Sequence, residues 1–457
     1  MEYTRAEIIN GVWLTHIRSD KFKTACLSIT LLTQLQRESA AMNALLPLVL
    51  RRGTARYTDM EAISRRLDEL YGAAIEPVVR RIGEIQCLGF FASVPEEDYL
   101  PAGADTLRGT CELMGQMLLA PNTRGGLLLP DYVDSERDKL IEMIRARLND
   151  KLSYSVSRCI EEMCCCENFA VSRFGDEESA AAIRYQKLTK QYRNLIQTSP
   201  IEIFYCGRAE EKRVESLLRD ALSTLPRGEI DYDIGTDVRL NALEETPREY
   251  TEQMNVTQAK LVIGWRLGKA MDDPNPAALR LFASLFGGST ASKLFVNVRE
   301  KLSLCYFASA VADVHKGVLL AYAGTEAENV GRAKEEIFAQ LASIANGEIT
   351  DEELSAARAD VKSALKSALD VQGALEGFYL SAALDGADYS PEELSALVDD
   401  VTKEELVEIA RGCECDMIYT LTGDGSEEDD GEDAADPGEE ELRAFEEDEN
   451  GNPDEEI

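Results

Sequence analysis

The order of strand and helix signals along this chain repeats, and this repetition most constrains its fold. Each copy opens with strands, continues through helices of 3.6-residue period, and closes with a strand that ends in glycine. The closing strands are IEIFYCG at 201–207 and MIYTLTG at 417–423, and the second copy opens with AKLVIGWRL at 259–267. The copies share element order rather than residue identity. Strands separated by helices, several of them in hairpins, predict a mixed sheet covered by helices. The predicted fold class is therefore α+β, with two homologous mixed-sheet domains.

The predicted organisation has four parts. Residues 1–225 form the first domain, 226–253 a polar linker, 254–425 the second domain and 426–457 an acidic tail. The tail holds 17 Asp and Glu residues against one Arg, with few apolar side chains. A segment of this composition cannot bury enough apolar surface to fold, so we expect it to be disordered. A partner-binding or substrate-mimicking acidic arm is the alternative.

Charge and hydropathy exclude several classes of partner. The net charge of −36 argues against binding to nucleic acid or to an anionic membrane. No run of 18 apolar residues is present, so we expect no membrane span. The first residues, MEYTRAEIING, lack a basic segment followed by an apolar core, which predicts no export signal and a cytoplasmic location.

Local capping signals place several helix starts. The pattern Ser/Thr-x-x-Glu, in which the two side chains satisfy each other's backbone donors, begins at Thr58, Thr350, Ser390 and Thr402. Leu140, Ile144 and Leu148 follow one face of a long helix that we expect to run from Val133 to about Cys166.

Histidines and cysteines do not form a recognisable metal motif. The chain has two histidines, and neither has the partners that a metal-binding helix needs three and four positions away. Three consecutive cysteines, Cys164, Cys165 and Cys166, fall on the predicted long helix, where neighbours point about 100° apart and cannot converge on one ion. We therefore expect no metal and reduced thiols that act as small apolar side chains. His16 and His315 are interpreted as structural or surface residues.

The segment GGSTASKLFVNVREKLSLCY, residues 287–306, resembles the C-terminal motif of the insulinase/pitrilysin family of inverted-zinc metallopeptidases. It contains the glycine pair, the Ser-x-Leu-Phe helix, the Arg-Glu-Lys turn and a Tyr seven residues after the Arg. The resemblance implies that Arg299 and Tyr306 bind substrate peptide. It also implies two homologous domains that form half of a clamshell.

The zinc motif of this family has no counterpart at the matching positions. The segment NALLPLVLRRGT, residues 43–54, is similar to the family helix that carries His-x-x-Glu-His. The resemblance places Ala44 and Leu48 at the histidine positions and Pro47 at the general base. It places Met143, with Glu142 beside it, at the third ligand. Because these side chains offer neither a zinc ligand nor a base, we expect no zinc-bound hydroxide and no hydrolysis.

The sequence is similar to a catalytically degenerate, YfmF-like subgroup associated with aminopentanol modification of elongation factor P. Segments LLPLVLRRGT and EEMCCCENFAVSRFG carry this similarity. It implies a non-catalytic subunit that pairs with a zinc-bearing relative, binds peptide and completes a shared chamber, with zinc in the partner only. Two alternatives stay open: a stand-alone homodimeric peptide-binding scaffold, and a peptidase with a non-standard site.

Overall fold

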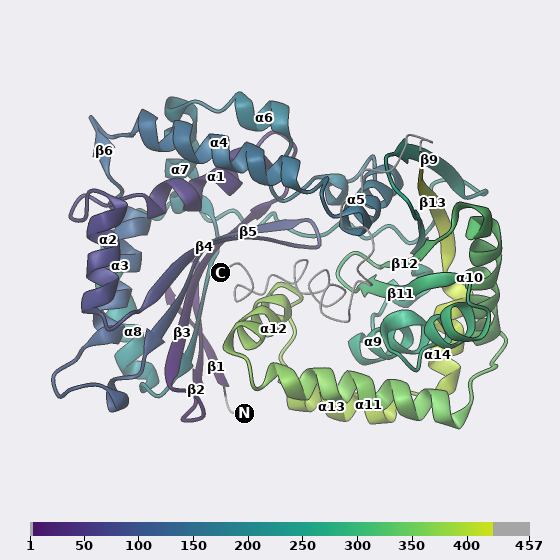
Figure 1. Ribbon diagram of the computed structural model, residues 1–457. Coiled ribbons are helices and arrows are strands. Elements are labelled where there is room, and N and C mark those ends of the chain that lie inside the picture. The colour runs from purple at the N-terminus through teal and green to yellow at the C-terminus, as the bar shows by residue number, and fades with distance from the viewer. Residues whose placement is uncertain (1–2, 424–457) are drawn as a thin grey trace.

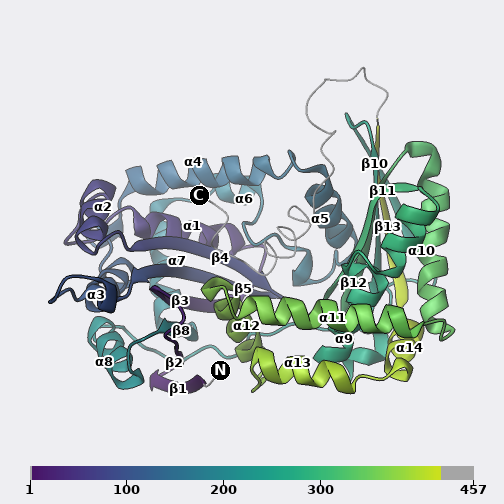
Figure 2. The ribbon, with the colours of Figure 1, turned by 60° about the horizontal axis from the view of Figure 1, so that its bottom comes forward.

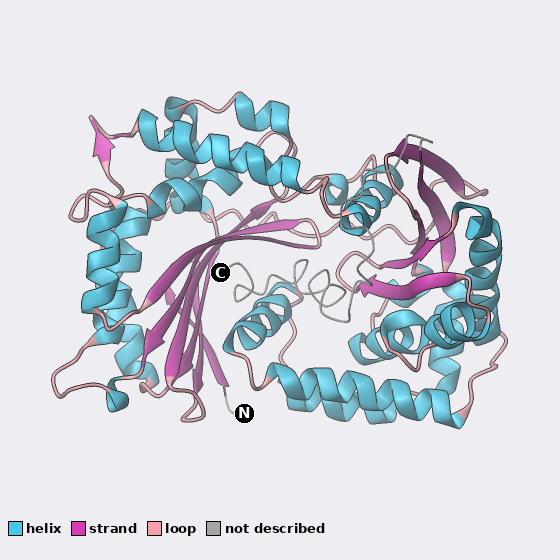
Figure 3. Cartoon of the chain, viewed as in Figure 1, coloured by secondary structure: helices cyan, strands magenta, loops and turns pink. Residues whose placement is uncertain are grey.

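Two sheets, each backed by helices, make up the described part of the chain. The computed structural model describes residues 3–423. The sheets stand at opposite ends of the molecule, with most helices on their outer faces (Figure 1, Figure 3). The expected architecture of two mixed sheets covered by helices is confirmed. The predicted tail, residues 426–457, lies outside the described residues. Among the residues described, no helix combines the length and apolar character that a membrane span requires.

The first sheet has six strands in the order β1-β2-β8-β3-β5-β4. Their bounds are β1 Tyr3–Ile9, β2 Val12–Arg18, β3 Thr24–Gln34, β4 Ala74–Ile82, β5 Ile85–Pro95 and β8 Ile201–Gly207. β2 and β8 are parallel, and the other neighbours are antiparallel. The central strands β3 and β5 are buried along nearly their whole length, as expected for strands covered on both faces.

Helices of the first half place their apolar stripes on one face of this sheet. They are α1 Ala40–Arg51, α2 Met60–Glu69, α3 Thr106–Leu119, α4 Pro130–Ala146, α6 Glu177–Ala181, α7 Tyr185–Thr198 and α8 Glu211–Ala221. Shorter elements are η1 Glu97–Tyr99, η2 Asn168–Ala170, β6 Thr123–Arg124 and β7 Leu127–Leu128.

The second sheet has five strands in the order β11-β12-β10-β13-β9, with β13 and β9 parallel. Their bounds are β9 Arg248–Met254, β10 Ala259–Arg266, β11 Cys305–Asp313, β12 Val318–Thr325 and β13 Glu414–Gly423. The range 226–253 was predicted as the linker. Residues 226–247 contain neither helix nor strand, whereas the end of that range forms β9 and belongs to the second sheet.

Helices of the second half cover the outer face of the second sheet. They are α9 Pro276–Ala283, α10 Val330–Ala345, α11 Asp351–Ala368, α13 Pro391–Asp400 and α14 Lys403–Gly412, with π-helical turns η4 Ser284–Gly288 and η5 Leu294–Lys301 and short turns η3 Gly268–Met271 and η6 Ala327–Asn329. α11 and α13 run side by side (Figure 2).

The two halves exchange one helix each. These helices are α5 Lys151–Met163 and α12 Gln372–Leu384. α5, from the first half of the sequence, packs Val156 and Ile160 against the second sheet. α12, from the second half, packs Leu375 and Tyr379 against the first sheet. Both helices lie between the sheets in Figure 1. Each sheet therefore depends on the other half of the chain to cover its inner face.

Buried charges hold the halves together at the base of α5. Lys316, in the turn between β11 and β12, is fully buried, and its Nζ lies 2.7 Å from Glu167 Oε2. Arg266 donates to Glu167 at 2.7 Å and to Asp416 at 2.9 Å. Burial tends to raise the pKa of Glu167, but the bonds from Arg266 and Lys316 outweigh it and lower the pKa. The cluster joins the segment after α5 to strands of the second sheet.

Local signals were correct for three helix starts and wrong for two features. Thr350, Ser390 and Thr402 form the predicted capping boxes of α11, α13 and α14. The prediction for Thr58 is wrong by one residue, because Asp59 caps α2 by accepting from Ala62 N. The single long helix from Val133 is also wrong. It is split into α4 and α5, because Asp150 accepts from two backbone N–H groups and starts a new helix.

Candidate functional site

Helix α1 places the predicted metal-site positions in or against the apolar core. Ala44 is completely buried, Pro47 is buried, and Leu48 is half-buried against the same core cluster. The helix forms here because its apolar residues cover the first sheet. Its side chains at these three positions are hydrocarbon, so α1 offers a bound cation no electron pair from them.

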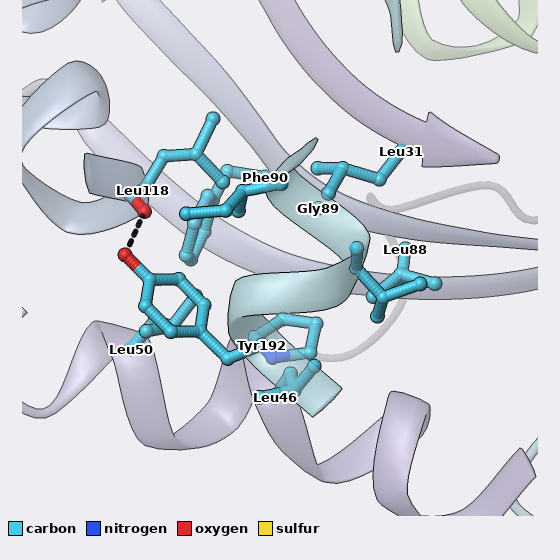
Figure 4. Close-up of a pocket in the computed structure, with 11 residues that line it drawn as sticks. Leu31, Leu46, Leu50, Leu88, Gly89, Phe90, Leu118 and Tyr192 are labelled. Carbon is cyan, nitrogen blue, oxygen red and sulfur yellow. Dashed lines mark hydrogen bonds between the residues drawn. The ribbon is translucent and has the colours of Figure 1, made fainter. Parts of the chain in front are cut away.

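Pro47 also changes the helix itself. Proline has no N–H, so the carbonyl of Asn43 loses its usual donor within α1. A cavity of about 10 Å³ lies beside Pro47, lined by apolar side chains that include Leu46, Leu50 and Phe90 (Figure 4). This volume is at the lower limit for one water molecule. The space is therefore a packing defect around the proline and not a ligand site.

The third predicted position lies on helix α4, which packs on α1. Met143 is half-buried and its neighbour Glu142 is exposed. Two turns earlier on α4, Glu136 is buried and accepts from Arg52 Nη1 at 2.9 Å and from Lys139 Nζ at 3.0 Å. The structure thus packs α4 against α1, and the buried carboxylate nearby is already paired with two cations.

A buried amide network that the sequence analysis did not identify lies next to Ala44. Asn43 donates to Gln86 Oε1 at 3.0 Å and accepts from Gln191 Nε2 at 2.8 Å. Gln86 in turn donates to the carbonyl oxygens of Ala40 and Arg173. Neutral amides from a helix, a strand and a second helix hold this region by hydrogen bonds. No local pattern could have identified it, because its members are far apart in sequence.

The glycine motif positions the second predicted site. A Cβ at Gly287 would lie 2.4 Å from the backbone nitrogen of Ala310, so η4 can approach β11 this closely only with glycine. Leu294 and Val298 anchor η5 in the core. Ser303 then takes a left-handed conformation with φ of 49°, which turns the chain into β11.

Arg299 and Tyr306 both reach solvent on either side of that turn. The Arg299 guanidinium lies 4.8 Å from the ring centre of Phe295, and its Nε is 4.0 Å from Glu300 Oε1. Tyr306 is 47 % exposed, and its hydroxyl donates to Glu326. That hydrogen bond and the negative charge of Glu326 raise the pKa of Tyr306. The hydroxyl therefore stays protonated at neutral pH and can donate.

The chain is similar to known peptidase-like proteins. The family model for the peptidase M16 inactive domain matches residues 182–361, which include η4, η5 and β11. The chain is 29 % identical over 408 residues to the probable inactive metalloprotease YmfF of Bacillus subtilis strain 168, covering 89 % of this chain and 95 % of that protein. These two matches show that the chain is similar to M16 peptidases over most of its length.

Solved structures agree with this similarity. A conserved protein from Enterococcus faecalis V583 is 26 % identical with a TM-score of 0.83, covering 93 % of this chain and all of that one. A peptidase M16 inactive domain from Pseudomonas fluorescens has a TM-score of 0.75 at 14 % identity, over 93 % of this chain and 98 % of that one, and supports the fold alone. The expected resemblance to the insulinase/pitrilysin family, including a catalytically degenerate member, is confirmed. The matching family model and this Bacillus relative are both described as inactive, peptidase-like proteins.

Elsewhere in the described residues, side chains that could bind a metal ion are also far apart from one another. Within residues 3–423, no three His, Cys, Asp or Glu side chains gather closely enough to hold a metal ion. The predicted metal-site residues belong to the first half, whereas Arg299 and Tyr306 belong to the second. The two sets of predicted site positions therefore lie in different halves of the chain.

Proposed function

We propose that this chain is the non-catalytic subunit of an M16 peptidase heterodimer. It closes over a zinc-bearing partner, binds the substrate peptide and supplies Arg299 and Tyr306 to the shared chamber. The observation that carries the proposal is the contrast between the two halves. Ala44, Pro47 and Leu48 offer no metal ligand, whereas the Arg-Tyr motif is intact, with Arg299 half-buried and Tyr306 exposed. Zinc is expected in the partner only.

The chemistry of the two side chains suits this role. The guanidinium of Arg299 is permanently charged and holds a fixed fork of donors that can bind a peptide carbonyl. The protonated hydroxyl of Tyr306 can donate to the oxyanion that develops on the scissile carbon. To do so it must exchange its bond with Glu326 for one with the substrate. Under this proposal, the Tyr306 hydroxyl breaks its hydrogen bond to Glu326 at the moment when it binds the substrate.

A cytoplasmic location and a connection with elongation factor P modification are part of the same proposal. All eleven cysteines are free thiols, and most are buried in apolar surroundings, as is usual in a reducing compartment. The connection with elongation factor P rests on the subgroup resemblance and makes that modification pathway the place to search for substrates.

The experiment is the isolation of the tagged chain from its source cells, followed by native mass measurement. The proposal expects an equimolar second chain that contains His-x-x-Glu-His and one zinc ion. A particle of two identical chains, with no second protein, would favour the homodimeric scaffold instead. Recovery of a monomer at cellular concentration would contradict both assemblies.

One observation favours a second candidate function, hydrolysis without zinc. Asp385 Oδ1 lies 2.7 Å from His315 Nδ1, and His315 Nε2 lies 2.8 Å from Ser381 Oγ. This is the order of acid, base and nucleophile in serine hydrolases. Ser381 lies inside α12, however, where the backbone N–H groups serve the helix, so α12 supplies no pair of free donors for an oxyanion.

A fluorophosphonate probe separates the two candidates. Labelling of the wild-type chain at Ser381 that disappears in Ser381→Ala and in His315→Gln would support an acyl-transfer site. Absence of labelling at Ser381 would make the three residues a structural contact between α12 and the turn before β12, and would leave the heterodimer proposal unaffected.

A further inference from the structure

The cysteine run after α5 does not lie on a helix. The sequence predicted that Cys164, Cys165 and Cys166 occupy helical positions that point about 100° apart. In the structure α5 ends at Met163, and the chain turns. Cys164 is buried, whereas Cys165 and Cys166 are exposed, with their Sγ atoms 3.8 Å apart. The expectation that these thiols diverge is wrong for the exposed pair.

The distance between the two sulfurs matches the separation of two thiolates that bind one soft cation. Two thiolates on a tetrahedral centre, each about 2.3 Å from the metal, stand about 3.8 Å apart. Direct oxidation fits less well. Adjacent Cα atoms are only about 3.8 Å apart across a trans peptide, below the usual disulfide range of about 4.4–6.8 Å. The pair is therefore better arranged to share an ion than to form a disulfide.

An arginine side chain lies beside the pair. Arg248 Nη1 lies 3.8 Å from Cys165 Sγ, and its other terminal nitrogen is 2.7 Å from Asp416 Oδ1. The hydrogen bond and the charge of Cys165 raise the pKa of Cys166, while Arg239 and Arg248 act in the opposite direction. Arg248 is itself held by the Asp416 carboxylate and by backbone carbonyls of α5, so it stays beside the thiols.

We propose that Cys165 and Cys166 form a binding site for a thiophilic ion that takes two thiolates, such as trivalent arsenic. With a monosubstituted arsenic(III) oxide, two S–H bonds and the arsenic–oxygen bond break, two As–S bonds form, and one water is released. Arsenic stays trivalent, so the step needs no oxidant. The site lies where the segment after α5 enters the buried cluster around Glu167, which places the bound ion at the junction of the two halves.

Phenylarsine oxide is the probe, and mass spectrometry of the intact full-length chain is the readout. The expected result is one adduct per chain, of probe mass less one water, that survives excess monothiol and is removed by a dithiol. Cys165→Ser and Cys166→Ser should each reduce the adduct retained against monothiol at least tenfold, because one sulfur cannot chelate. Both side chains are exposed, so these near-isosteric variants should fold normally, which circular dichroism checks.

A matched pair of cysteines provides the control. Cys413 and Cys415 are half-buried and lie two positions apart, Cys413 at the end of α14 and Cys415 near the start of β13. The double variant Cys413→Ser/Cys415→Ser should keep the wild-type adduct. Loss of the adduct in this control, equal retention by the single variants at 165 and 166, or no retained adduct on the wild-type chain would each overturn the proposal.

Discussion

Lys316 Nζ lies 2.5 Å from Glu84 Oε1, and neither side chain is more than 3 % exposed. Glu84 lies in the turn between β4 and β5 of the first sheet, and Lys316 in the turn between β11 and β12 of the second. The same ammonium also contacts Glu167 and the carbonyl of Asp237. One cation therefore joins two hairpin turns, the segment after α5 and the connection between the halves.

We expect Lys316→Met to destabilise the chain by roughly 3–5 kcal/mol, since removing one partner of a buried pair leaves the other charge uncompensated. Here two carboxylates, Glu84 and Glu167, would remain. Urea unfolding measures the change. Lys362→Met is the matched control. It removes an exposed pair with Asp399 and should cost at most about 1 kcal/mol. Equal effects of the two variants would show that the cluster is not an energetic link between the halves.

The contact of His315 with α12 should make stability depend on pH. Burial opposes the charged imidazole, but the hydrogen bond that His315 donates to Asp385 and the charges of Asp313 and Asp385 outweigh burial and the repulsion of Arg280, so the pKa of His315 is raised above its usual range. A raised pKa in the folded state stabilises the protein below the unfolded pKa, and this contribution is lost as pH rises through the folded pKa.

The difference in unfolding free energy between wild type and His315→Gln should therefore be larger at about pH 6 than at about pH 8.5. Urea unfolding at both pH values measures it. The Asp385→Asn variant removes the negative charge beside His315 while keeping an oxygen that can accept from Nδ1, and should reduce the pH dependence. If the wild type and both variants change in parallel with pH, His315 does not couple protonation to folding.

Local sequence patterns predicted the helices and strands of this fold better than the way in which its two halves pack together. The glycine-ended strands became β8 and β13, and the capping boxes became the starts of α11, α13 and α14. These features depend on residues within a few positions of one another. The exchange of α5 and α12 depends on which sheet face a helix covers, and periodicity gives the apolar stripe of a helix but not its partner. The break at Asp150 was missed because apolar spacing continues across it.

The candidate site shows the same division. The motif around Arg299 and Tyr306 was visible because its glycines and turn lie within one short segment. The hydrogen-bond partner of Tyr306 was not predicted: Glu326 directly follows β12, which pairs with the strand β11 that carries Tyr306. The buried pair formed by Lys316 and Glu84 was also not predicted, because a lysine in a turn is usually exposed and no local signal indicates its burial.

The purified chain is expected to retain no stoichiometric zinc and to cleave no peptide. The positions Ala44, Pro47, Leu48 and Met143 provide neither ligands nor a base. Metal analysis after dialysis measures this, in wild type and in the Cys165→Ser/Cys166→Ser variant. Zinc lost in that variant would belong to the exposed thiols. About one zinc per chain retained in the variant, with chelator-sensitive proteolysis, would contradict the prediction.

Arg299 and Tyr306 are expected to act on the partner's reaction. If the proposed heterodimer forms, Tyr306→Phe removes the hydroxyl but keeps the ring, and loss of one oxyanion donor typically lowers kcat roughly 10²–10³-fold. Arg299→Ala should weaken substrate binding and raise KM. Both side chains are largely outside the core, so the complex should keep its stoichiometry. Leu302→Ala, an exposed residue of the same turn without a polar group, is the control and should leave both constants near wild type. If an intact complex carrying both Arg299→Ala and Tyr306→Phe has unchanged kcat and KM, the proposal is contradicted and the two residues have a structural role only.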